Sequence, residues 1–248
     1  MRKITPLLAL VALVGLTHCG SEKKTEATEG PETGSTTDAP AQTTLDLATA
    51  RARLSSLEAD LITLPGEPQD MTVQLTENDE LGNLWKAPTV GYPGWSSDSA
   101  FVMGLTNFFQ DSQNLALYHA QGRTNTEAGT KKWVGSVQIA SSHRIPDPAD
   151  PAVLQGVSLG KYQLVENEGR RDQYTYQGLV LAYFTFDAQS ESVVKTPSEQ
   201  LPTHTPTILF EGYKVSKDSS EVYWTVWGLG EEEDIKAGIQ LPTTAQQP

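Results

Sequence analysis

The sequence contains a single cysteine, Cys19, among its 248 residues. One thiol excludes an intrachain disulfide framework and any zinc or iron–sulfur site built from cysteines. Basic residues are also few, because 18 Lys and Arg stand against 31 Asp and Glu and leave a formal net charge of −13. Nucleic acids are bound through basic surfaces that meet phosphates, so this balance argues against a nucleic-acid-binding protein.

Long hydrophobic runs are also lacking. The apolar run at residues 7–16, LLALVALVGL, follows the basic pair Arg2 and Lys3. Ten residues are too few to cross a hydrocarbon core of about 30 Å as a helix, whereas this arrangement is typical of a secretory signal peptide. The run ends in LTHCG, so the single cysteine stands where the apolar run stops.

In this segment the chain resembles the bacterial lipoprotein precursors that signal peptidase II cleaves. Leu16 stands at the −3 apolar position and Cys19 at the +1 position, while His18 replaces the usual small residue. The resemblance covers residues 1–20 alone, and it implies cleavage before Cys19 and acyl chains that anchor the mature protein stably. Because Gly20 is not the Asp that commonly retains lipoproteins in the inner membrane, the resemblance implies an outer-membrane location in a Gram-negative bacterium. The alternative is an ordinary secretory signal with a chance cysteine.

Composition divides the rest of the chain. Residues 20–44 contain no Val, Ile, Leu, Met or aromatic residue, so nothing there offsets the entropy of ordering. Apolar residues then recur at helical spacing and predict an amphipathic helix, which is too short for a safe coiled coil and is expected to pack on the following domain. These residues are Leu47, Ala50, Leu54, Leu57 and Leu61. We therefore expect a signal peptide (1–18), a disordered polar tether (19–44), a helix (45–65), a β-domain (66–240) and a flexible tail (241–248).

The body of the chain is predicted to be β-structure. Alternating or apolar segments indicate strands at 71–76, 99–106, 114–120, 132–140, 159–166, 173–187, 206–216 and 220–229. No convincing helix pattern follows residue 65, so the sheet must be mainly antiparallel. We predict a mainly β fold, either an antiparallel β-sandwich or an up-and-down β-barrel of about eight strands, preceded by one amphipathic helix.

Two of these strands, 173–187 and 220–229, are apolar or aromatic on both faces. Such strands are usually covered on both sides. In a sandwich the second cover would be the N-terminal helix or a long loop. In a barrel it would be a partner protein.

Long loops are the expected place for binding on a compact β-domain. They are predicted at 77–98, 141–152 and 188–205. The first of them holds Trp85, Tyr92 and Trp95, which form either a stacking platform for a sugar or peptide or a plug at the end of the β-core.

Catalytic and metal motifs receive little support. The segment 156–160 matches G-x-S-x-G, but the nucleophile elbow needs a turn and a helix after Ser158, and a strand pattern follows instead. Three dispersed histidines show no metal-ligand spacing and are expected to be surface residues: His119, His143 and His204. The acidic clusters 77–80 and 231–234 lack the spacing of a calcium loop and are expected to be solvated. We predict no catalytic residue, metal or cofactor.

These features together predict a lipid-anchored bacterial cell-envelope protein whose β-domain binds or scaffolds without catalysis. Its partners would be the membrane, through lipidated Cys19, and an envelope protein or glycan. Two alternatives remain open, a barrel that carries a small apolar ligand and an envelope hydrolase.

Overall fold

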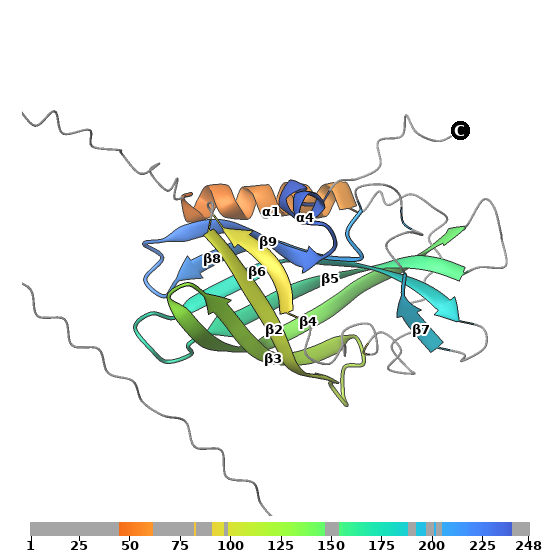
Figure 1. Ribbon diagram of the computed structural model, residues 1–248, viewed down its shortest axis with the longest axis horizontal. Helices are drawn as coiled ribbons and strands as arrows, with labels where there is room; N and C mark the ends of the chain where they lie inside the picture. The colour runs from red at the N-terminus through yellow and green to blue at the C-terminus, as the bar shows by residue number, and fades with distance from the viewer. Residues whose placement is uncertain are drawn as a thin grey trace, which may run out of the picture. The chain divides into compact units, whose positions relative to one another are not determined.

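The computed structural model describes residues 45–61, 82, 91–96, 99–146, 154–187, 192–196, 201 and 205–239 (Figure 1). The predicted signal peptide, the tether, the strand at 71–76 and the C-terminal tail lie outside these residues. Neither helix of the described part is both long and apolar enough to cross a membrane.

Eight antiparallel strands close into an up-and-down barrel, so the second of the two predicted architectures is the one observed. Each strand pairs with its neighbour along the chain, and the last pairs with the first at Gly94 and Trp227. The strands are β1 (Gly91–Ser96), β2 (Ser99–Gln110), β3 (Leu117–Thr126), β4 (Gly129–Pro146), β5 (Leu154–Glu166), β6 (Tyr174–Asp187), β8 (Ile208–Ser216) and β9 (Val222–Leu229). A ninth strand, β7 (Ser192–Lys195), pairs with the end of β6.

The structure corrects four local predictions. Strand β4 continues to Pro146, into the loop expected at 141–152. Strands β1 and β7 occupy segments that were expected to be loops, and helix α4 (Glu232–Ala237) replaces the solvated loop expected at 231–234. The sequence of β1, GYPGWS, is dominated by turn-forming residues, and its strand conformation depends on pairing with β2 and β9. Helix α4 is too short to show a periodicity, and its buried Ile235 anchors it.

Helix α1 (Leu47–Leu61) covers the outer face of the barrel, and this confirms that the helix packs on the β-domain. Asp46 caps it by accepting a hydrogen bond from the main-chain N–H of Thr49 at 2.8 Å. Its apolar face packs on outward side chains of β5 and β6: Val157, Leu159, Leu179 and Leu181. The second cover of β6 and β9 is therefore this helix, although a partner protein was expected in a barrel (Figure 1).

Aromatic side chains fill the barrel interior. The rings of Phe210 and Trp227 stack with centroids 3.5 Å apart, and Tyr92 and Tyr162 meet both of them edge-on. The void beside this stack measures about 20 Å³, which is room for roughly one water molecule. The barrel interior around this stack is therefore closely packed.

Candidate functional site

A cavity of about 510 Å³ lies at one end of the barrel. Four pairs of strands, β1–β2, β3–β4, β5–β6 and β8–β9, turn at this end, and their terminal side chains surround the cavity. Its volume is within the range of small-molecule sites. The cavity is lined by Ser96, Ser99, Ala100, Phe101, Thr124, Thr126, Glu127, Ala128, Lys131, Glu166, Tyr174, Tyr176, Lys214 and Tyr223.

A buried carboxylate forms one wall of the cavity. Glu166, at the end of β5, is 2% exposed and accepts a hydrogen bond from the hydroxyl of Tyr176 at 3.1 Å. The ammonium of Lys131 lies 3.5 Å from the other oxygen. Burial, with Glu166 adding to it, raises the pKa of Tyr176, so this hydroxyl remains a donor at neutral pH. These contacts offset the desolvation of the carboxylate.

A lysine on the neighbouring wall has no such partner. Lys214 projects inward from β8, and its ammonium lies 5.4 Å from the ring centroid of Tyr174 and 5.0 Å from that of Tyr223. Within the described residues it forms no ion pair or hydrogen bond. Burial lowers the pKa of Lys214, while Glu166 and Glu221 act in the opposite direction. The cavity therefore contains an ammonium group whose N–H donors have no hydrogen-bond acceptor among the described residues.

The ring of Tyr174 lies near the ammonium groups of both lysines. The ammonium of Lys131 also lies 5.4 Å from its ring centroid. Its hydroxyl donates a hydrogen bond to Glu221, and burial together with this carboxylate raises the pKa of Tyr174. The cavity thus offers ammonium and hydroxyl donors, carboxylate acceptors and aromatic faces, a combination suited to binding a small polar molecule.

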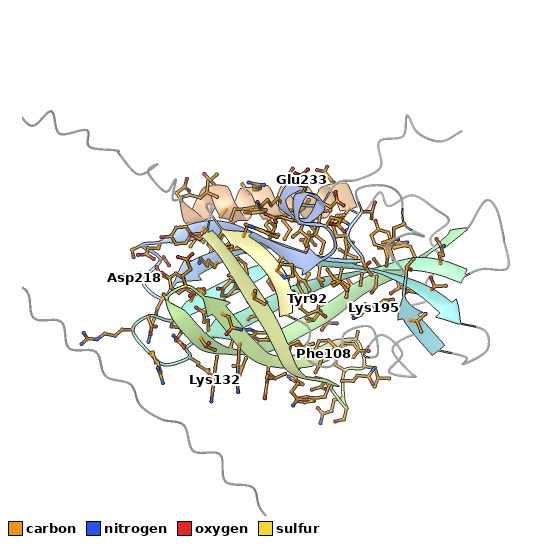
Figure 2. All side chains as sticks on the ribbon, viewed as in Figure 1. Tyr92, Phe108, Lys132, Lys195, Asp218 and Glu233 are labelled. Atoms are coloured by element: carbon orange, nitrogen blue, oxygen red, sulfur yellow. The ribbon has the colours of Figure 1, made fainter. Side chains whose placement is uncertain are left out.

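The predicted aromatic platform is divided by the sheet. Tyr92 points into the barrel, is 2% exposed and has a pKa raised by burial to about 12 (Figure 2). Trp95, three residues further along β1, lies on the outer face, where the ammonium of Lys236 is 5.0 Å from its ring. These two residues cannot share a platform, and Tyr92 fits the core-plug alternative. Trp85 and Cys19 lie outside the described residues.

The G-x-S-x-G match does not form a nucleophile elbow. Ser158 lies within β5, is 1% exposed and accepts a hydrogen bond from Ser142 of β4 at 3.2 Å. An elbow would instead place the serine on an exposed turn between a strand and a helix.

His119 and His143 lie on different strands, β3 and β4. His119 pairs with Asp111 at 2.9 Å and His143 with Ser141 at 3.0 Å, while His204 lies outside the described residues. In the part of the chain that the structure describes, no three His, Cys, Asp or Glu side chains are grouped to hold a metal ion.

Sequence reasoning missed the charged residues of the cavity wall, among them Lys131, Glu166 and Lys214. Each points to the same face of its strand as nearby core residues. Trp133, for example, is two positions from Lys131, and Leu164 is two positions from Glu166. A charged residue at an inward position next to a predicted turn is the signal that would have identified them. It was overlooked because the binding site was sought in the long loops.

Comparison of the chain with protein-family models, with curated proteins and with solved structures gives no match. The chemistry of the cavity is therefore the basis for proposing a function.

Proposed function

We propose that the chain is a lipid-anchored protein of the bacterial cell envelope whose β-barrel binds a small polar molecule without transforming it. The observation that carries this proposal is the cavity of about 510 Å³ with charged side chains at inward positions. Charged groups in a barrel mouth lower stability relative to apolar ones unless they are fully paired. Their presence above an otherwise aromatic core favours a binding role.

Binding is favoured over the two alternatives by what surrounds the cavity. Apart from Lys214, the charged and phenolic groups at its centre are held in pairs, Lys131 with Glu166 and Tyr174 with Glu221. Among the described residues that line it there is no histidine to activate a serine or threonine. An apolar ligand would have to displace the aromatic stack beneath, where the void measures only about 20 Å³.

The proposed anchor rests on the signal features and on Cys19. A polar segment without large apolar residues follows the cysteine, and as a flexible coil of 25 residues it would reach about 25–30 Å. That length would hold the barrel clear of the lipid headgroups and leave the cavity open to solutes of the envelope.

Changing Cys19 to alanine should move the protein from the membrane to the soluble fraction, because the acyl chains would have no attachment site. Fractionation, intact mass and labelling with a fatty-acid analogue measure this. His18→Gly is the matched variant, since it restores the small residue usual before the cysteine and should leave the protein acylated. A wild-type protein that is soluble and unacylated would refute the anchor and leave the binding proposal standing.

Filling the cavity should abolish binding. Ser99 is exposed at the start of β2, lines the cavity and has the inward strand parity of Phe101, so Ser99→Trp should obstruct the cavity without disturbing the core. In a full chain carrying Cys19→Ala, we expect polar solutes detected by saturation-transfer NMR to bind this variant at least about tenfold more weakly. Ala52→Trp, on the exposed face of α1, is the control and should bind normally. Equal binding by both variants, or none by the parent chain, would contradict the proposal.

A further inference from the structure

We infer that the cavity selects a small monocarboxylate with a planar apolar body, whose carboxylate binds the ammonium of Lys214 while its body lies against the rings of Tyr174 and Tyr223. This inference rests on the proposed binding function and names the class of ligand.

The position of the negative group follows from the two lysines. Lys131 already has carboxylates, at 3.5 Å from Glu166 and 3.8 Å from Asp172. Lys214 has no acceptor within the described residues, although its side chain is largely withdrawn from water. An anionic oxygen beside it would supply a charge-assisted hydrogen bond, which is about twice as strong as a neutral one. Lys214 is therefore the cation that a ligand would complete.

The limit of one negative charge on the ligand follows from the carboxylates that line the cavity. Glu166 lines the same cavity and is buried, so little solvent screens its field. Glu127 adds a carboxylate at the exposed rim. A dianion such as a phosphate monoester would meet about twice the repulsion from these carboxylates that a monocarboxylate meets.

The planar body follows from the aromatic walls. The rings of Tyr174 and Tyr223 flank the ammonium of Lys214, and Phe101 lines the cavity from the core side. Flat apolar groups pack well against aromatic rings, in stacked or edge-on arrangements. The aromatic stack below prevents a long alkyl chain from entering the barrel, so the ligand must be compact.

Three probes of similar shape test this inference on the full chain carrying Cys19→Ala: benzoate, the neutral benzamide and the dianionic phenyl phosphate. Titration calorimetry at pH 7.5 or so should show benzoate binding at least about tenfold more tightly than either of the others. Lys214→Met should weaken benzoate binding by about tenfold and leave benzamide binding unchanged, whereas Lys214→Arg should retain benzoate binding.

Lys132→Met is the matched control, because it makes the same change of charge one residue away from the cavity wall. Lys132 is exposed on the outer face of β4 and points away from the barrel (Figure 2), so its loss should not alter benzoate binding.

Three outcomes would overturn the inference. They are equal binding of benzoate and benzamide, preference for phenyl phosphate, and full benzoate binding by Lys214→Met. If neutral solutes bind in a manner sensitive to Ser99→Trp while benzoate does not bind at about 1 mM, the ligand class is wrong and the binding function survives. If no solute of any charge binds the parent chain, both proposals fail.

Discussion

Replacing Glu211 with alanine should lower the free energy of unfolding by about 3 kcal/mol. Glu211 lies on the outer face of β8 and is 5% exposed. One carboxylate oxygen accepts a hydrogen bond from the indole N–H of Trp224 at 2.8 Å and lies 3.5 Å from the guanidinium of Arg53. The other accepts the main-chain N–H of Ile239 at 2.6 Å. Alanine would leave two donors without acceptors.

The size of this effect reflects what the carboxylate joins. Arg53 belongs to α1, and its guanidinium also lies 4.0 Å from the ring of Trp224 on β9. Ile239 follows α4, so a single side chain connects both helical segments to the barrel. Arg53 is more than half exposed and can be hydrated when the carboxylate is lost. Most of the destabilisation should therefore come from the two N–H groups.

Urea unfolding provides the measurement, with Glu168→Ala as the control because Glu168 is exposed in the β5–β6 turn. Glu211→Gln should recover less than half of the loss, since an amide offers one acceptor oxygen where the carboxylate uses two. A loss for Glu211→Ala within about 0.5 kcal/mol of that for Glu168→Ala would show that these contacts do not stabilise the fold.

Stability should also fall steeply above pH 10, by about 4 kcal/mol for each further pH unit. Burial raises the pKa of Tyr92 to about 12 and raises those of Tyr162 and Tyr176 further. Below pH 10 these phenols are protonated in both the folded and the unfolded state, so they give no pH dependence. Above pH 10 the unfolded chain releases protons that the folded chain retains, and unfolding becomes more favourable. Tyr92 stops contributing to this pH dependence as the pH approaches 12, because its phenol then ionises in the folded protein as well.

Lys214 acts with the opposite sign but over a different range. Because its folded pKa is lowered, its contribution to stability rises with pH up to the ordinary lysine pKa of 10.5. It therefore partly offsets the effect of the tyrosines between pH 10 and 10.5 and no longer opposes it at higher pH, where it is neutral in both states.

Unfolding by urea between pH 9 and pH 11, together with absorbance near 295 nm, checks the alkaline prediction. Tyr162→Phe should reduce the slope by about 1.4 kcal/mol per pH unit. Its hydroxyl faces Thr225 and Trp227 without a hydrogen bond of regular geometry among the described residues, so the change should cost little at pH 7. An unchanged slope in this variant would contradict the assignment of the effect to buried phenols.

Local patterns in the sequence were enough to predict the helix and most of the strands. Helical spacing of apolar residues predicted a helix within 45–65, where α1 spans Leu47–Leu61, because only one face of that helix is buried. The apolar character of both faces of β6 is explained by the structure, since Tyr176, Val180 and Phe184 line the interior while Leu179 and Leu181 face α1. Where the pattern was short or rich in glycine and proline, as in α4 and β1, it failed.

The sequence by itself therefore determined that the domain is antiparallel β-structure with one covering helix, since both features follow from periodicity along the chain. Only the tertiary structure decided between sandwich and barrel, because alternation is the same in both and closure depends on the pairing of two strands far apart in the sequence, β1 with β9. The cavity was decided in the same way. Lys131, Glu166 and Lys214 come from the ends of three different strands, and only closure of the sheet gathers their side chains around one space.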